Sequence, residues 1–405
     1  MALELLSPAG DREKLIRAVA YGADAVYLAG SQYGMRAFAG NFERGELLEA
    51  VQLCHSHGVA VHVTCNTNPR NGELEGLPQY LEFLAQAQVD ALIIGDPGVF
   101  RLALRHAPDI PRHISTQAGI TNYESAAYWY DQGASRVILA RELSLEEVAG
   151  IKSRAPKGLE VEVFVHGAIC MAYSGRCVIS NYMTGRDATR GACAQPCRYR
   201  YALMEEQRPG EYFPVEEDER GSYLLSSRDM CMIDHIPALL AAGVDSLKIE
   251  GRAKSAYYAA IVTGAYRRAI DAAQKGEPLE AVWREEVEKV SHRHYSTGFY
   301  YGQPGQYTKD SRYIRDWQVA AQVVSCDERG RAALTLHNKL RTGDALELVG
   351  PGLAPVAFAA GEMTDEAGMS MEEARRPDSL FYMTLPCPAP RFSYLRRRVE
   401  GESSS

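Results

Sequence analysis

The chain lacks the segments that would take it out of an aqueous compartment. No apolar run approaches the roughly 18 residues that a membrane span requires. The first residues, MALELLSPAGD, contain no charged stretch followed by an apolar one and do not resemble a secretory signal. We therefore expect a cytoplasmic protein with no membrane partner, whose thiols stay reduced. The cysteine count of nine is odd, which excludes complete disulfide pairing.

The motifs of several common enzyme classes are also missing. No GxGxxG follows a predicted strand, and neither the HExxH of zinc proteases nor the GxSxG of serine hydrolases occurs. The formal net charge of −8 disfavours indiscriminate nucleic-acid binding. A local basic surface remains open, and its candidates are CRYRY at 197–201, YRRAI at 266–270 and RFSYLRRR at 391–398.

A repeated pattern of short β-rich runs after amphipathic segments predicts the fold. Many runs begin at a glycine, which can end the preceding helix in the left-handed conformation at little steric cost. The runs are LELLSPA, GADAVYL, GVAVHVT, QVDALII, RHISTQ, GASRVIL, LEVEVFVHG and GVDSLKI. Eight alternating βα units predict an α/β protein with a (β/α)₈ TIM-barrel-like N-terminal domain, and a doubly wound open sheet is the alternative.

One connection of the predicted barrel is much longer than the others. About 80 residues separate the seventh strand, ending at His166, from the eighth, near Leu247. Within them, RYRYALM and GSYLLSS are expected to form a hairpin around an acidic loop. Because the loops after barrel strands build active sites, this insertion at 167–235 lies on the predicted functional face.

The pattern changes near the C-terminus. From about Trp317, short alternating runs with turn signals predict a small all-β barrel domain. We expect a catalytic barrel domain at 1–285, a connector at 286–315, the β-domain at 316–400 and a disordered tail at 401–405.

Five cysteines lie in or just behind the insertion's first stretch and could hold a metal. They are Cys170, Cys177, Cys193, Cys197 and Cys231. Four thiolates satisfy either tetrahedral zinc or an iron–sulfur cluster. Zinc knuckles use closely spaced pairs, and only Cys193 and Cys197 are so placed, so the wide spacing favours a cluster.

The other four cysteines, Cys54, Cys65, Cys326 and Cys387, occur singly in apolar patterns and are expected to pack as small hydrophobic side chains. A nucleophilic site is the alternative use of the insertion. His166 and Cys170 are four residues apart, and a thiolate beside an imidazole is an activated nucleophile. That arrangement would make the chain a cysteine-type hydrolase.

The run EVFVHGAICMAYSGRCVISNYMTGRDATRGACAQPCRYRY resembles the signature of the collagenase-like peptidase family of unassigned catalytic type, peptidase U-32. The resemblance extends through LLSPAGDREKLIRAVAYGADAVYL, YGMRAFAGNF, SSRDM, SLKIEGRAKSAYY and STGFYYG, and covers nearly the whole chain. Within the family, the chain is most similar to the bacterial tRNA hydroxylation proteins, which convert the wobble uridine to 5-hydroxyuridine.

The resemblance implies an enzyme that binds the tRNA anticodon loop, holds a [4Fe-4S] cluster and uses prephenate as hydroxyl source. By position, the family's cluster ligands fall on Cys170, Cys177, Cys193 and Cys231, with Cys197 as the alternative to Cys231. Other family members imply other activities: hydroxylation of rRNA or of a quinone precursor, a non-catalytic subunit in a heterodimer with a paralogue, or a collagenase-like peptidase. A homo-oligomer is a further alternative.

Strand ends direct the remaining candidates to the barrel mouth. We expect catalytic roles for His166, Lys248 and Glu250, although KIEGR at 248–252 equally fits a structural ion-pair lattice. Arginine binds carboxylates and phosphates bidentately, tyrosine stacks on bases, and RFSYLRRR would supply further cations for RNA. The predicted substrate-binding residues are Arg36, Gln117, Arg141, Tyr173, Arg176 and Arg252.

Overall fold

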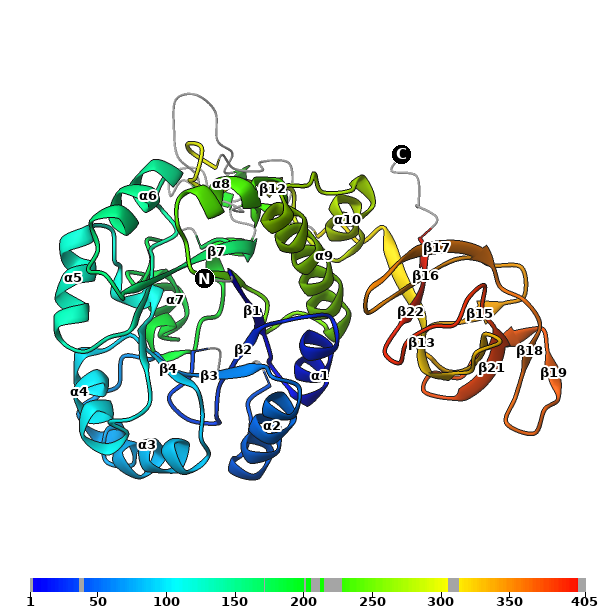
Figure 1. The fold of residues 1–405 in the computed structure, drawn as a ribbon, viewed down its shortest axis with the longest axis horizontal. Helices are drawn as coiled ribbons and strands as arrows, with labels where there is room; N and C mark the ends of the chain where they lie inside the picture. The colour runs from blue at the N-terminus through cyan, green and yellow to red at the C-terminus, as the bar shows by residue number, and fades with distance from the viewer. Residues whose placement is uncertain are drawn as a thin grey trace. The chain divides into compact units, whose positions relative to one another are not determined.

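The computed structural model describes residues 3–35, 40–170, 172–199, 202–204, 212–214, 228–304 and 313–399. Its largest element is a closed barrel of eight parallel strands, in which β11 pairs with both β1 and β7 (Figure 1). The strands are β1 (Glu4–Pro8), β2 (Ala25–Leu28), β3 (Ala60–Cys65), β4 (Ala91–Ile94), β5 (Arg112–Ile114), β6 (Arg136–Ile138), β7 (Glu160–Ala168) and β11 (Ser246–Ile249). The predicted (β/α)₈ barrel is confirmed.

Helices connect the strands, and α2 to α6 lie outside the ring (Figure 1). The glycines that open four of the predicted strands, at 22, 58, 133 and 243, have φ between +69° and +99°. They end the preceding helices in the left-handed conformation, as expected. The helices are α1 (Arg12–Ala20), α2 (Arg44–Ser56), α3 (Leu77–Gln86), α4 (Pro97–His106), α5 (Tyr123–Asp131), α6 (Leu145–Arg154), α7 (Ile179–Thr184), α8 (Ile236–Ala241), α9 (Ala256–Lys275) and α10 (Ala281–Glu286).

The insertion after β7 extends the barrel sheet. Strand β10 (Asp229–Cys231) pairs antiparallel with β7, and β12 (Tyr295–Ser296) pairs with β10. The predicted hairpin is partly wrong. Its strands are β8 (Ala202–Met204) and β9 (Tyr212–Pro214), so the second strand lies inside the stretch predicted as a loop, where Tyr-Phe favours extended structure. The predicted strand GSYLLSS, residues 221–227, lies outside the described residues.

By their contacts, the residues group into two units. The barrel unit contains Met1–Leu15, Asp24–Lys254 and Arg293–Tyr313. The C-terminal unit contains Ile16–Ala23, Ser255–His292 and Ile314–Ser405. The domain limits expected from the sequence stay a prediction, because this grouping follows contacts and not a single cut in the chain. The expected tail at 401–405 lies outside the described residues, as does Arg36.

The C-terminal unit contains an antiparallel sheet of eight strands in the order β17-β16-β22-β13-β14-β21-β18-β19, and a two-stranded ribbon of β15 and β20. Its core consists of aliphatic and aromatic side chains, among them Leu334, Leu348 and Phe381, each 0–1% exposed. The predicted all-β domain is confirmed. Its strands are β13 (Trp317–Cys326), β14 (Arg331–Leu336), β15 (Leu340–Arg341), β16 (Ala345–Gly350), β17 (Leu353–Ala359), β18 (Met363–Thr364), β19 (Ser370–Met371), β20 (Glu373–Ala374), β21 (Leu380–Thr384) and β22 (Tyr394–Arg398).

The segment RFSYLRRR was expected to supply cations for RNA. Its last five residues form β22, which lies between β13 and β16 in the sheet. The expectation is wrong for Arg396, which is fully buried and bonded to Glu286 at 2.5 Å and to Glu347 at 2.7 Å. Arg397 pairs with Asp344 at 2.8 Å. Three consecutive arginines resemble a solvated surface, and only the tertiary fold brings the carboxylates that let one of them enter the core.

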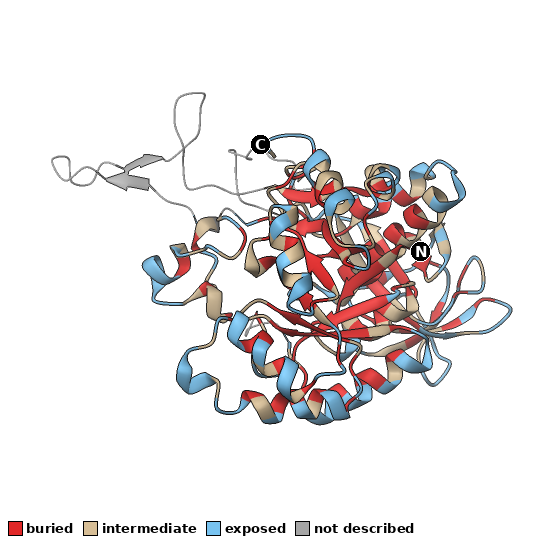
Figure 2. Ribbon diagram, turned by 60° about the vertical axis from the view of Figure 1, so that its left-hand side comes forward, coloured by how far each residue is buried: buried red, intermediate tan, exposed pale blue. Residues whose placement is uncertain are grey.

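Buried residues concentrate in the strands and on the helix sides that face them (Figure 2). Outward-facing helix positions are exposed, which is the pattern of amphipathic helices around a barrel. Within the described ranges, no helix combines the length and the apolar character needed to cross a membrane.

Candidate active site at the barrel mouth

A small cavity lies at the carboxyl ends of the barrel strands. The structure brings five of the predicted site residues together in its wall: Gln117, Arg141, Lys248, Glu250 and Arg252. They come from segments that follow or end β5, β6 and β11. The carboxyl ends of parallel strands meet at one rim of a barrel, which is why residues far apart in sequence converge here.

Lys248 anchors the floor of the cavity. Its Nζ bonds Glu162 Oε1 at 2.8 Å and lies 4.5 Å from the centre of the Tyr27 ring. The Tyr27 hydroxyl donates to Glu250 Oε2 at 3.3 Å. Two of the predicted catalytic residues, Lys248 and Glu250, are therefore held in place by side chains from β2 and β7. Lys248 presents its ammonium group to the cavity in a fixed position.

A paired network of charges lies below this floor. Arg136 bonds Glu4 at 2.5 Å and Glu162 at 3.0 Å. Burial opposes ionisation of Glu162, but Lys248 and Arg136 outweigh it and hold the pKa of Glu162 below its usual value. Burial likewise opposes ionisation of Glu4, and the bond to Arg136 more than compensates, so the pKa of Glu4 is lowered. The barrel interior thus carries ionised pairs at neutral pH.

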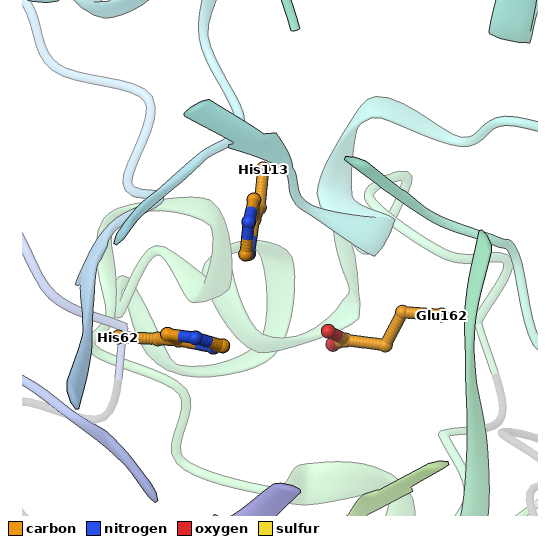
Figure 3. Close-up of side chains that lie close together, drawn as sticks. All are labelled: His62, His113 and Glu162. Atoms are coloured by element: carbon orange, nitrogen blue, oxygen red, sulfur yellow. The ribbon is translucent and has the colours of Figure 1, made fainter. Parts of the chain in front are cut away.

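Two histidines complete this interior. Potential ligand atoms of His62, His113 and Glu162 lie within 4.8 Å of one another, and the side chains point toward a common centre (Figure 3). Burial lowers the pKa of His62 and lowers that of His113 far more, so both rings are neutral. Two histidines and a carboxylate can bind a metal.

The same carboxylate, however, already bonds two cations, Lys248 and Arg136. A divalent ion would meet both, so the geometry favours polar packing of the barrel interior over a metal centre. One signal of this layer was overlooked in the sequence, namely a histidine in each of the strand runs GVAVHVT and RHISTQ.

Arg252 holds the loop that follows β2. Its guanidinium donates to the Met35 carbonyl at 3.0 Å and to Asn41 Oδ1 at 2.7 Å. This loop contains Arg36, another predicted substrate-binding residue, which lies outside the described residues. Arg252 is buried, so its contacts give it a structural part in shaping the cavity wall beside any role in binding.

Arg141 connects the cavity with the cysteine-rich segment, by which we mean Cys170 and residues 172–199. It donates to the Ala168 carbonyl at 2.8 Å and to Cys170 Sγ at 3.5 Å, and its guanidinium lies 5.0 Å from the centre of the Phe164 ring. Among the described residues, no carboxylate lies within ion-pair distance of Arg141. Its positive charge is therefore available to an anionic ligand in the cavity.

The cysteine-rich segment is tied to the barrel rim just beyond Cys170. Ser174 bonds the Glu142 carboxylate through its backbone N–H at 2.8 Å and its hydroxyl at 2.9 Å. Gly175 follows with φ of +75°, and a Cβ atom there would lie 2.0 Å from the Gln117 carbonyl. Only glycine permits this close approach. The segment therefore passes directly over the end of β5, beside the cavity.

The structure describes all nine cysteines and pairs none of them in a disulfide. Cys54 and Cys65 are fully buried, and burial raises the pKa of each to about 12. They are protonated packing residues, as expected. Cys326 and Cys387 pack against the core of the C-terminal unit.

The five cysteines of the insertion region are partly or fully accessible, unlike Cys54 and Cys65. Cys170 lies two residues beyond β7, and Cys231 ends β10 directly opposite His166 of β7. Cys193 Sγ accepts a hydrogen bond from the Gln195 backbone at 3.4 Å, and Cys170 Sγ accepts one from Arg141. Accessible thiols with N–H donors to sulfur are the kind of ligand that an iron–sulfur cluster uses, and a cluster held by these cysteines stays a prediction. The choice between Cys197 and Cys231 stays a prediction.

His166 is buried, whereas Tyr173 and Arg176, which lie between Cys170 and Cys177 in the chain, are exposed. His166 is 1% exposed, and its Nε2 lies 3.4 Å from the Tyr295 hydroxyl. Cys170 Sγ accepts a hydrogen bond from Arg141, and the cysteine-hydrolase alternative stays a prediction. Tyr173 and Arg176 are exposed on the cysteine-rich segment, away from the cavity's lining.

Comparison with known protein families agrees with this geometry. The model of peptidase family U32 matches residues 10–310, and that of the U32 C-terminal domain matches residues 315–396. The chain belongs to peptidase family U32. The two matched regions together cover the barrel with its insertion and the C-terminal sheet.

Several proteins that are similar to this chain have names that refer to RNA. The "tRNA hydroxylation protein P1" of Bacillus subtilis is 37% identical over 92% of this chain and 90% of the relative. The "tRNA hydroxylation protein P" of Escherichia coli is 35% identical over 99% of this chain and 98% of the relative. The "23S rRNA 5-hydroxycytidine C2501 synthase" of Escherichia coli is 40% identical over 67% of this chain and 39% of the relative.

Proposed function

We propose that this U32 protein is an RNA hydroxylase, and that its reaction is the conversion of the wobble uridine of tRNA to 5-hydroxyuridine. The names of relatives that align with almost the whole chain support RNA hydroxylation in general. The wobble position suits such chemistry because an anticodon loop is single-stranded, and its base can turn into a pocket with little loss of pairing.

One observation carries the proposal: Arg141 lies in the cavity wall and also donates to Cys170 Sγ. The cavity for a small co-substrate and the candidate cluster ligands are therefore neighbours. A peptidase is the alternative, and it would need a cysteine nucleophile activated by a neighbouring base.

The proposed co-substrate is prephenate, a dicarboxylate. Arg141, with its available charge, would bind one carboxylate, and the ammonium of Lys248 would add positive potential at the cavity floor. Glu250 lies in the same wall and can accept a proton there. His166, opposite Cys231 and bonded to Tyr295, is better placed to position β10 than to contact the substrate.

The proposed ligands of a [4Fe-4S] cluster are Cys170, Cys177, Cys193 and Cys231. When bound, the cluster would supply a one-electron carrier beside the base. Replacing C5–H by C5–OH removes two electrons from uridine, and the proposal requires an external two-electron acceptor to take them up. The protein's part is to hold the base, exclude water and neutralise the carboxylates of the co-substrate. Arg141 would serve both sites, because it touches each of them.

The test is expression of the chain in a bacterial strain that lacks 5-hydroxyuridine, followed by mass spectrometry of tRNA nucleosides. Wild-type protein, purified without oxygen, should contain iron and sulfide and restore the nucleoside. Arg141→Gln should lower the yield roughly 10- to 100-fold, because it removes a charge-assisted contact. Arg101→Gln, an exposed arginine on α4, is the matched control.

Three outcomes would contradict the proposal. Colourless protein that cleaves gelatin, with cleavage lost in Cys170→Ala, would indicate a peptidase. Hydroxylated rRNA or quinone precursor without modified tRNA would move the chain to another substrate. Activity that appears only with a paralogue present would identify the chain as a subunit of a heterodimer.

A further inference from the structure

The cysteine-rich segment carries an unusual number of exposed apolar side chains. Among the described residues, thirteen large hydrophobic side chains are exposed, and five of them fall within 172–199. Tyr182, on α7, is 89% exposed, and Tyr199 is 52% exposed. The full set is Tyr173, Val178, Tyr182, Met183 and Tyr199. Exposed apolar groups concentrated in one short segment mark an interaction site.

Four of these residues belong to two short elements that pack together, the helix α7 and the 3₁₀ turn at Pro196–Arg198. Tyr182 and Met183 lie within α7, Val178 precedes it as its N-cap, and Tyr199 follows the turn as its C-cap. The Ala194 backbone N–H donates to Ser180 Oγ at 2.9 Å, which joins the elements, and the Tyr199 hydroxyl donates to the Ala194 carbonyl at 2.9 Å. The α7 surface is defined here as Val178, Tyr182, Met183 and Tyr199. Its scaffold is fixed, while its large side chains remain in solvent.

The charge of this segment has the opposite sign to that of the chain. Residues 172–199 contain four arginines and one aspartate, whereas the whole chain has a formal net charge of −8. Arg176 and Arg186 are exposed, and Arg190 pairs with Glu73. A second copy of the same surface would bring like charges together, whereas a polyanion complements them.

We propose that the α7 surface is the platform for single-stranded RNA, with Tyr182 and Tyr199 stacking on unpaired bases and Arg176 and Arg186 contacting the backbone. This inference rests on the proposed function and locates its RNA contacts. Aromatic side chains interleaved with cations are the usual means of binding single strands, since every base offers a face for stacking. Duplex RNA keeps these faces covered.

The position of the surface in the chain strengthens the assignment. Cys177 directly precedes α7, and Cys193 and Cys197 lie on either side of the residues that join the two elements. Bases stacked on the α7 surface would hold a neighbouring base near the candidate cluster ligands. The C-terminal segment RFSYLRRR, which was expected to bind RNA, has fewer cations available for phosphate contacts, because Arg396 is buried and Arg397 is paired with Asp344.

The test measures RNA binding separately from hydroxylation. The probe is a fluorescent anticodon stem-loop RNA with uridine at the first anticodon position, and full-length cluster-loaded protein is titrated by anisotropy. Tyr182→Ala should bind roughly 10- to 100-fold more weakly, which is the usual loss for one stacked base. The matched control is Tyr128→Ala, 57% exposed on α5, which should bind as the wild type does. Iron content should be unchanged in both variants.

Salt dependence provides a second readout. Arg176→Gln should reduce the slope of log affinity against log salt by about 0.7, as expected for one lost phosphate contact to a single strand. A fully paired RNA duplex of the same length should bind weakly and show no effect of Tyr182→Ala.

Wild-type affinity in Tyr182→Ala, together with restored 5-hydroxyuridine by the wild-type protein, would leave the proposed function standing and refute the α7 surface. Loss of self-association in Tyr182→Ala, with RNA affinity intact, would show a protein interface and refute it too. No RNA binding and no hydroxylation by the wild-type protein would overturn both proposals.

Discussion

The barrel unit and the C-terminal unit fill their interiors with different chemistry. Inside the barrel, Arg136 and Lys248 pair with Glu4 and Glu162, and two neutral histidines lie among them. The core of the C-terminal unit is aliphatic and aromatic, with the pairs of Arg396 at its margin. Buried ion pairs contribute little net stability, because the loss of hydration offsets their attraction. Apolar side chains of similar volume would make the barrel interior at least as stable.

The difference lies in what the buried charges reach. Lys248 bonds Glu162 in the barrel interior and also lines the cavity at its mouth. Arg396 instead joins strand β22 to Glu286 at the end of α10 and to Glu347 on β16. Buried charge in the barrel serves a site, whereas in the C-terminal unit it fixes packing. The following experiments can break or sharpen this contrast.

The largest difference is expected in bound iron, between variants that replace a cysteine of the barrel unit and a cysteine of the C-terminal unit. Cys170→Ala should remove the bound iron and abolish hydroxylation, because a cubane deprived of one thiolate is no longer fully ligated. Cys387→Ala, which alters a residue packed on the core of the C-terminal unit, should keep the iron. Iron and sulfide assays after anaerobic purification measure both.

The same assay decides between the two candidates for the fourth ligand. Cys231→Ala should lose the cluster and Cys197→Ala should keep it. The reverse result would show that the ligand lies within the cysteine-rich segment and not on β10.

The next largest effect is expected at Arg396. Arg396→Met should destabilise the C-terminal unit by about 3–5 kcal/mol, because Glu286, 1% exposed, loses its bidentate partner. Urea unfolding followed by tryptophan fluorescence reports the change, since the Arg396 guanidinium lies 5.1 Å from the centre of the Trp317 ring. An unchanged midpoint would show that Lys289, 3.3 Å from Glu286, is a sufficient partner.

A smaller effect is expected from the barrel histidines when the pH falls. Burial holds the pKa of His113 well below its usual value, so below about pH 6.5 the unfolded chain binds a proton that the folded state refuses. The free energy of unfolding should therefore be highest above pH 6.5 and should decrease as the pH falls toward 5. His113→Gln should make that decline shallower by about 1.4 kcal/mol per pH unit.

Thermal unfolding between pH 5 and 8 measures this slope. His337→Gln, at an exposed position of the C-terminal unit, is the control. Equal slopes for His113→Gln and the wild type would mean that the barrel interior admits a proton in the folded state.

The smallest effect is expected at Arg397, the neighbour of Arg396 in sequence. Its pair with Asp344 is about a quarter exposed on both sides, so Arg397→Met should cost no more than about 1 kcal/mol. The same urea experiment applies. A loss as large as that of Arg396→Met would show that burial does not separate these two arginines.

Much of the fold follows from local sequence patterns. Each of the eight barrel strands was predictable, because a glycine or turn before a short apolar run is a local signal. Two predictions were wrong for a common reason: that RFSYLRRR is a cationic surface, and that the stretch containing β9 is a loop. The role of RFSYLRRR depends on carboxylates at Glu286 and Glu347, and β9 depends on a partner strand; neither partner is visible from the stretch itself.

The candidate site divides in the same way. The strand-end positions of Gln117, Arg141 and Lys248 identified residues that the structure brings together at the barrel mouth, whereas the cysteine ligand set stays a prediction. The layer of His62 and His113 went unseen. The sequence shows a histidine in each of two β-rich runs, but it does not show that the two rings meet inside the closed barrel.

By itself, the sequence determined that the chain forms an eight-stranded barrel followed by an all-β region and that it carries a cysteine-rich insertion after the seventh strand. These properties depend on local periodicity and on residue types. Only the tertiary structure decided which charges pair, that Arg141 touches both the cavity and Cys170, and that one of three consecutive arginines lies in a core. Such properties depend on distances between residues far apart in the chain, and closure of the barrel sets those distances.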